Sequence, residues 1–222
     1  MELTSEVKMA LRPVLLKTLP EYIYAKLNKI MDVVIVNDAH RREVEKNPKG
    51  ACVSVCLVLQ LALQYFEIPV RVVKVCEMFL NTRAQELVKT LSGSDFVKEL
   101  QKRGPNYIPG DPWTVGLGYP DKNLPKEMYA VHSVIFFPDG SILDPTAAQA
   151  TRPEKGLVVE NYWETIDSLP AVVGQFMVSR EQVQLDSAAI LRHPEFPEIV
   201  NYATNTIRKA LMPILIEYGY DL

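Results

Sequence analysis

The chain has little of what marks a secreted protein. It holds only three cysteines in 222 residues, an odd number set among apolar neighbours. This pattern is typical of reduced thiols and does not fit a disulfide framework. The first residues carry early acids and lack a basic region followed by a continuous apolar core, so we expect no signal peptide. The sequence therefore predicts a cytoplasmic protein.

An excess of positive charge is also missing. The chain carries 24 Lys and Arg against 27 Asp and Glu, which gives a net charge of −3, and the sequence pI is about 5.7. A nucleic-acid-binding protein needs a basic surplus to neutralise phosphate groups. We therefore expect no nucleic-acid partner.

Long hydrophobic runs are absent as well. A membrane-spanning helix needs about 20 consecutive apolar residues, and the best candidate here is interrupted by Ser54, Gln60 and Gln64. The sequence also has no internal repeat, low-complexity tract or Gly/Ser linker. We expect no membrane partner, and a chain of this length favours a single domain over residues 1–222.

The elements that the sequence does contain predict an α+β fold. Hydrophobic residues recur at helical spacing over 4–46, with a break near Pro20, and over 83–103, with a weak point at residues 92–94. A C-terminal helix is expected from residue 197 onward. Strand-like patterns lie between the helices, at 70–79, 128–146, 157–164 and 171–185. Their order favours an antiparallel sheet with helices on its flank.

The most apolar helix is predicted over residues 51–66. It is apolar nearly all round, which indicates a central, buried position. Cys52 stands in its first turn, where unsatisfied N–H groups and the helix dipole stabilise negative charge. A cysteine here is either a small core residue or a nucleophile, and the choice depends on what the rest of the chain brings to it.

A cysteine nucleophile needs a base within hydrogen-bond reach and a group that orients this base. His40 lies in a charged stretch, and His193 lies in a loop-like segment. His132 lies within a predicted strand, where a polar ring is costly unless it is paired. It is therefore either a half-buried histidine satisfied by a backbone carbonyl or the base of the site.

The turn after this strand supplies a partner for His132. Residues 138–140, Pro-Asp-Gly, fit a three-residue loop with a type I turn and a left-handed glycine. This register puts Val134 opposite Asp144, so that His132 and Asp144 lie on the same face as diagonal neighbours. A two-residue loop would put them on opposite faces.

Residues 103–127 are rich in proline, glycine and aromatics, which predicts a long loop. Loops of this length in compact domains are usually functional or mobile. The aromatic residues Tyr107, Trp113 and Tyr119 either line an acyl-substrate pocket or hold a surface loop in place.

Two blocks of the sequence resemble transglutaminase-like (papain-like) cysteine enzymes of the uncharacterised bacterial and phage type. In "GACVSVCLVLQLALQYFEIPVRVV", Gly-x-Cys opens a helix, a small residue follows four positions on, and Ile-Pro-(small)-Arg begins a strand. The block "HSVIFFPDGSILDPTAAQ" is similar to the histidine strand and the Asp-Pro-Thr strand of the same family.

The resemblance implies a papain-like core, in which the buried helix that carries the cysteine packs on an antiparallel sheet. Residues 1–48 would form an N-terminal helical part, 49–180 the catalytic core and 181–222 a C-terminal helical part. The resemblance also implies three catalytic roles: nucleophile, base and orienting acid, held by Cys52, His132 and Asp144.

The position six residues before Cys52 is Lys46, where papain-type proteases place an oxyanion-hole glutamine. The hole would then use the Cys52 backbone N–H and a second donor. We consider Asn37, Trp113 and Tyr119 for this role, and the resemblance suggests Gln149 for the rim of the pocket.

We therefore predict cysteine-dependent acyl transfer or amide hydrolysis without a cofactor or metal, on an unidentified acyl or peptide substrate. A non-catalytic binding or scaffold module on the same fold is an alternative, and so is an arylamine-acetyltransferase-like enzyme. A zinc site of Cys52, Cys56 and His132 would need a fourth ligand that the sequence does not offer. The sequence leaves open the acyl acceptor and the oligomeric state.

Overall fold

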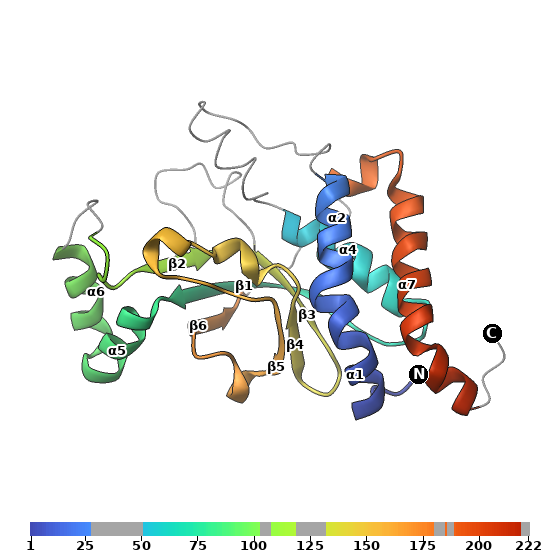
Figure 1. Cartoon of the computed structure of the whole chain (residues 1–222), viewed down its shortest axis with the longest axis horizontal. Helices are drawn as coiled ribbons and strands as arrows, with labels where there is room; N and C mark the ends of the chain where they lie inside the picture. The colour runs from blue at the N-terminus through green and yellow to red at the C-terminus, as the bar shows by residue number, and fades with distance from the viewer. Residues whose placement is uncertain (28–50, 103–107, 119–131, 180–184, 186–188, 219–222) are drawn as a thin grey trace.

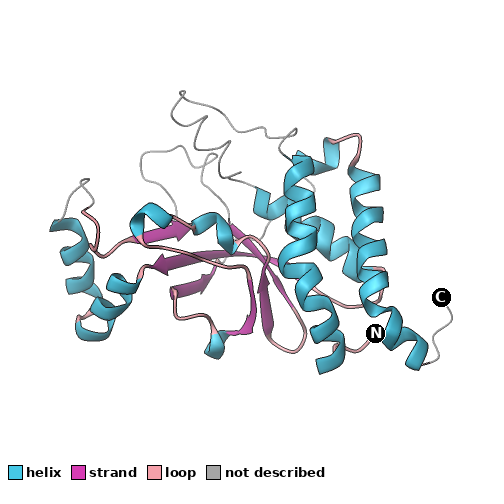
Figure 2. Cartoon of the chain, viewed as in Figure 1, coloured by secondary structure: helices cyan, strands magenta, loops and turns pink. Residues whose placement is uncertain are grey.

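A computed structural model describes residues 1–27, 51–102, 108–118, 132–179, 185 and 189–218. The architecture is α+β, as expected. A six-stranded antiparallel sheet lies between a group of helices on one side of the molecule and two short helices at the far end (Figures 1 and 2).

The bounds of the elements follow the sequence patterns closely. The α-helices are α1 (Ser5–Pro13), α2 (Leu19–Leu27), α4 (Ala51–Gln64), α5 (Thr82–Thr90), α6 (Gly93–Lys102) and α7 (Phe196–Glu217). The strands are β1 (Arg71–Leu80), β2 (Thr114–Leu117), β3 (His132–Phe136), β4 (Ser141–Asp144), β5 (Tyr162–Thr165) and β6 (Val173–Val178). The expected weak point after residue 91 separates α5 from α6.

Strand β1 organises the sheet because it pairs with three other strands, β2, β3 and β6. The sheet continues from β3 to β4 and from β4 to β5. In the β3–β4 hairpin, Ile135 pairs with Leu143 and Phe136 with Ile142. Gly140 has φ +81°, the left-handed conformation that the Pro-Asp-Gly turn predicts. The predicted hairpin register is confirmed.

Helix α4 is the centre of the helical group. It packs against α2, α7 and the strands β1 and β3, and most of its side chains are buried, as its nearly continuous apolar sequence predicts. The core between helices and sheet includes Leu11, Leu59, Ile135 and Ile207, none of which is exposed. A second core lies on the other face of β3 and includes Val75, Phe79 and Val134.

The expected helix break near Pro20 is wrong. The chain stays helical from Ser5 to Leu27, and its irregularity is a π-helical stretch, Val14–Thr18, that lies between two proline residues. The N–H of Leu19 bonds to the carbonyl of Val14 rather than to the residue four positions before it. A wider turn of this kind accommodates proline, which cannot donate to the helix and crowds the preceding turn.

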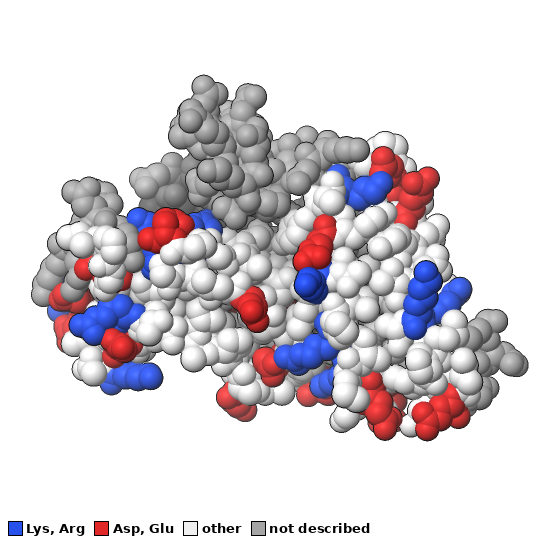
Figure 3. All heavy atoms as spheres, in the orientation of Figure 1, with Lys and Arg blue, Asp and Glu red and all other residues white. Residues whose placement is uncertain are grey.

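The Pro/Gly-rich segment is not all loop, because it contains strand β2. Residues 37–50 lie outside the described residues, and so do residues 103–107 and 119–127 of the Pro/Gly-rich segment. On the face that Figure 3 shows, acidic and basic side chains are interspersed over the described surface. None of the described helices has the length and apolarity needed to cross a bilayer.

Candidate active site

A buried histidine–aspartate pair lies on the β3–β4 hairpin. The Nε2 atom of His132 lies 2.8 Å from Oδ2 of Asp144. His132 is 2% exposed and Asp144 is fully buried. The pairing that the turn geometry predicted is confirmed, and the ring does not depend on a backbone carbonyl for its partner.

Thr146 holds the other oxygen of this carboxylate. Its backbone N–H and its hydroxyl donate to Oδ1 of Asp144, at 2.8 and 3.1 Å. Asp144 therefore accepts two hydrogen bonds from Thr146 on one oxygen and faces His132 with the other. Hydrogen bonds on both oxygens fix the orientation of the carboxylate, which in turn orients the imidazole.

The second turn of α4 meets the start of β3. The Sγ atom of Cys56 donates to the carbonyl oxygen of Ser133, at 3.2 Å, and burial raises the pKa of the Cys56 thiol well above its usual value. This contact favours a structural role for Cys56 over a zinc ligand. Cys52 lies one turn closer to the helix N-terminus and is 2% exposed, while His132 is the residue immediately before Ser133.

The charge environment of His132 links it to both predicted partners. Burial lowers the pKa of the imidazole, whereas the negative charge of Asp144 and the hydrogen bond with Asp144 raise it. A side-chain hydrogen bond with Cys52 also raises it. The net pKa lies well above the usual value for histidine, which favours the imidazolium form.

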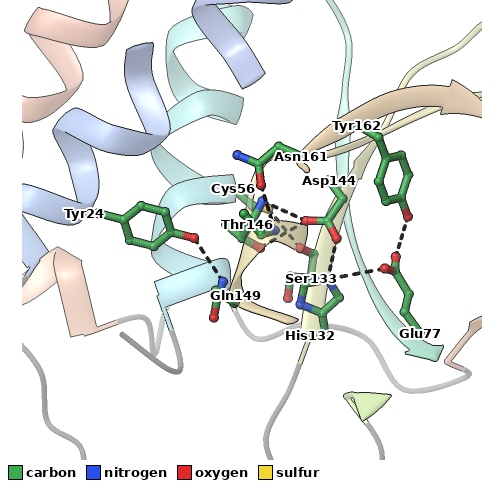
Figure 4. Close-up of polar contacts among 11 residues, drawn as sticks. Tyr24, Cys56, Glu77, His132, Ser133, Asp144, Thr146, Gln149, Asn161 and Tyr162 are labelled. Atoms are coloured by element: carbon green, nitrogen blue, oxygen red, sulfur yellow. Dashed lines mark hydrogen bonds and ion pairs between the residues drawn. The ribbon is translucent and has the colours of Figure 1, made fainter. Parts of the chain in front are cut away.

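A second buried acid, Glu77, completes the group, and sequence reasoning missed it. Its Oε2 lies 3.9 Å from Nε2 of His132, and its Oε1 accepts a hydrogen bond from the Tyr162 hydroxyl at 2.8 Å. Figure 4 shows the polar ends of Glu77, His132, Asp144 and Tyr162 turned toward one another, from β1, β3, β4 and β5. Burial, and then the charge of Asp144, raise the pKa of Glu77 to about 8.

The pattern of β1 contained a signal for this residue. Buried Val75 and Phe79 alternate along the strand, and Glu77 takes the inward position between them. A charged residue at an inward strand position points to a partner or a function. Tyr162, by contrast, reaches the site only through the pairing of β4 with β5.

Glu77, His132 and Asp144 are also the group of described residues that could hold a metal ion. Their ligand atoms all lie within 4.8 Å of one another. Two carboxylates and one imidazole are ligand types that zinc and other divalent metals accept. The zinc set considered from the sequence differs, because it joined His132 to Cys52 and Cys56.

Gln149 lies close to the site. Its Nε2 donates to the hydroxyl of Tyr24, at 3.0 Å, so a residue of α2 faces the segment that follows β4 (Figure 4). Burial raises the pKa of Tyr24, and the charges of Asp144 and Cys52 raise it further. The neutral phenol is therefore the stable form. The substrate-binding role of Gln149 stays a prediction.

The other predicted binding residues have different outcomes. Asn37 and Tyr119 lie outside the described residues. Trp113 is tied to the start of α5, because its backbone exchanges hydrogen bonds with Asn81, and the Lys155 ammonium lies 4.8 Å from its ring centroid. Its predicted role as an oxyanion donor stays a prediction.

Gly118, just after β2, approaches the site through its backbone. It has φ +75°, and a Cβ atom there would lie 2.1 Å from the carbonyl oxygen of Val75 and 3.0 Å from Cβ of His132. Only glycine allows this approach. Its carbonyl accepts a hydrogen bond from Cys76 Sγ at 3.1 Å. Cys76 is half-buried.

Comparison of the sequence and the structure with protein-family models, with curated proteins and with solved structures found no match.

Proposed function

We propose that this protein is a cysteine-dependent enzyme that transfers an acyl group or hydrolyses an amide through a thioester on Cys52. The observation that carries the proposal is the buried His132–Asp144 hydrogen bond at 2.8 Å, on a hairpin whose strand β3 contacts α4 at Cys56, one turn beyond Cys52. A side-chain hydrogen bond also joins His132 to Cys52. A histidine oriented by a carboxylate is the base that thiol nucleophiles require.

In the proposed reaction, each side chain has a distinct role. Transfer of the Cys52 thiol proton to Nδ1 of His132, whose Nε2 faces Asp144, gives a thiolate–imidazolium pair, and this pair is the resting form of the site. The sulfur attacks the acyl carbon, the Sγ–C bond forms, and the bond to the leaving group breaks. His132 then returns the proton to the leaving group. Attack of water or an amine on the thioester releases the acyl product and restores the thiol.

The raised pKa of His132 is consistent with this chemistry. A histidine that is stable as imidazolium stabilises an adjacent thiolate. Asp144 fixes the ring and stabilises its positive charge. No step requires a metal or organic cofactor.

The finer classification of the fold belongs to the same proposal. We assign the chain to the transglutaminase-like, papain-like architecture, with residues 49–180 as its catalytic part. A buried helix with cysteine in its first turn, packed on an antiparallel sheet that carries histidine and aspartate on adjacent strands, supports this assignment. The three cysteines are free thiols, which supports a reducing compartment such as the cytoplasm.

Trapping of the acyl-enzyme tests the proposal directly. The protein is incubated with p-nitrophenyl acetate, quenched in acid, digested and analysed by mass spectrometry for acetylated peptides. We expect one acetyl group on Cys52 in the wild type and none at this position in Cys52→Ala. The variant His132→Gln should acetylate at least about 100-fold more slowly, in line with the usual contribution of a general base.

Cys56→Ala is the matched control, since it removes a neighbouring buried thiol and leaves Cys52 in place. It should retain acetylation of Cys52. Absence of acetyl-Cys52 in the wild type, or equal rates in the wild type and His132→Gln, would refute the proposal and favour a binding or scaffold module.

A further inference from the structure

Glu77 is the part of the site that the proposed reaction leaves unused. It is fully buried, yet only one of its oxygens has a hydrogen-bond donor within the described part of the chain, the Tyr162 hydroxyl. Oε2 lies 3.9 Å from His132 Nε2, which is too long for a hydrogen bond. A buried carboxylate oxygen without a donor costs free energy that the fold would have to offset.

A proton on Glu77 removes this cost. Two carboxylates so close to one histidine would place two negative charges against one positive charge inside the protein. A carboxylate oxygen of Asp144 lies within 4.8 Å of an oxygen of Glu77, so a protonated Glu77 is placed to donate to Asp144, and only one carboxylate charge then remains beside the imidazolium. This hydrogen bond with Asp144 is among the causes that raise the pKa of Glu77.

We propose that Glu77 is a positioning residue of the site: held by Tyr162, it carries a proton and donates it in a hydrogen bond to Asp144, so that the charge of one carboxylate rather than two faces His132. This role rests on the proposed function, because the pair that Glu77 positions is the one that activates Cys52. Above about pH 8, Glu77 ionises and adds the second negative charge.

The groups that face Glu77 are few, so its titration can be interpreted. They are His132 on β3, Asp144 on β4 and Tyr162 on β5, and the charge of Glu77 also reaches Cys56 on α4. The described strands β2 and β6, which pair with β1 on either side of this position, carry no titratable side chain. Tyr162 stays neutral, because burial and then the charges of Asp144 and Glu77 raise its pKa.

Carbon-13 NMR of the full chain tests the proton on Glu77. The protein is labelled at the glutamate carboxyl carbon, and the Glu77 signal is assigned by its loss in Glu77→Gln. We expect this signal at the position of a protonated carboxyl at pH 6, with a midpoint near pH 8. A Glu77 signal that titrates below pH 5 with the other glutamates would overturn the proposal.

Two variants of similar size separate positioning from packing. Glu77→Gln is neutral and still donates a hydrogen bond, whereas Glu77→Met does not donate. We expect the ring nitrogen-15 shifts of His132 at pH 6.5 to match the wild type in Glu77→Gln and to differ in Glu77→Met. When pH is varied, the His132 shifts of the wild type alone should show an inflection near pH 8, where Glu77 titrates. Identical His132 shifts in all three proteins would overturn the proposal. If Glu77→Met does not fold, the carboxyl titration of the wild type is the test of the proposal.

The same samples test the competing metal site. The titration is repeated with EDTA and with one equivalent of Zn²⁺. Signals that do not respond to either support the protonated carboxyl. Stoichiometric shifts of Glu77 and His132 with Zn²⁺, lost in Glu77→Gln, would overturn it in favour of a bound metal.

The positioning role of Glu77 and the catalytic role of Cys52 can be refuted separately. Acetylation of Cys52 with a pH profile that is the same in the wild type and both Glu77 variants would leave the enzyme intact and refute the role of Glu77. A Glu77 midpoint near pH 8, in a protein whose Cys52 is never acetylated, would support the buried proton on Glu77 and refute the catalytic role of Cys52.

Discussion

Replacement of Glu77 by glutamine should change how stability depends on pH. The folded protein keeps a proton on Glu77 up to about pH 8, whereas the unfolded chain releases it near 4.5. Since the folded state binds more protons in this window, the free energy of unfolding falls as pH rises from about 4.5 to 8. At about 1.4 kcal/mol per pKa unit, the loss is at most about 5 kcal/mol.

Glutamine cannot ionise, so the variant lacks this loss. Urea unfolding at pH 5 should give similar stabilities for the two proteins, within about 1 kcal/mol, because the amide replaces a neutral carboxyl of the same shape. At pH 8.5 the variant should be the more stable by about 2–5 kcal/mol. Other groups titrate in both proteins and largely cancel in the difference. Parallel stability curves from pH 5 to 8.5 would refute the buried proton.

Three further substitutions test the surroundings of the site. Gly118→Ala should lower the free energy of unfolding by at least about 2 kcal/mol in urea, because the glycine has positive φ and lies against the Val75 carbonyl; a wild-type stability would contradict that contact. Asp144→Asn should lower the pKa of His132, measured by nitrogen-15 NMR, since the charge that raises it is lost; an unchanged midpoint would show that Asp144 does not control the ring. Asn81→Ala removes four side-chain hydrogen bonds, including the N-cap of α5, and should cost about 2–4 kcal/mol in the same urea assay; a loss below 1 kcal/mol would contradict this role.

Local chain chemistry was enough to predict the His132–Asp144 pair. The Pro-Asp-Gly turn determines the loop length, the loop length sets the register, and the register puts both side chains on one face. The position of Cys52 in the first turn of a buried helix was likewise predictable, because that helix is apolar nearly all round.

Contacts that join distant segments could not be predicted in this way. Tyr24 reaches the site from α2, and Tyr162 reaches it from β5. Neither position has a local pattern that distinguishes it from an ordinary core aromatic. The continuity of the helix through Pro20 was missed for a related reason. It depends on a π-helical stretch, which tertiary packing of the buried Leu15 and Leu19 stabilises and which propensity does not reveal.

Reactivity of the three thiols tests the central claim most directly. The native protein is treated with iodoacetamide at pH 6, and the labelling rate of each cysteine is measured by mass spectrometry in the wild type and in His132→Gln. By exposure, Cys76 should react first, since it is half-buried whereas Cys52 is 2% exposed.

A nucleophile paired with His132 reverses this order. We predict that Cys52 labels faster than Cys76 in the wild type, and that His132→Gln slows Cys52 by at least about tenfold while it leaves Cys76 unchanged. Labelling in the order of exposure, with no effect of His132→Gln on Cys52, would contradict the account.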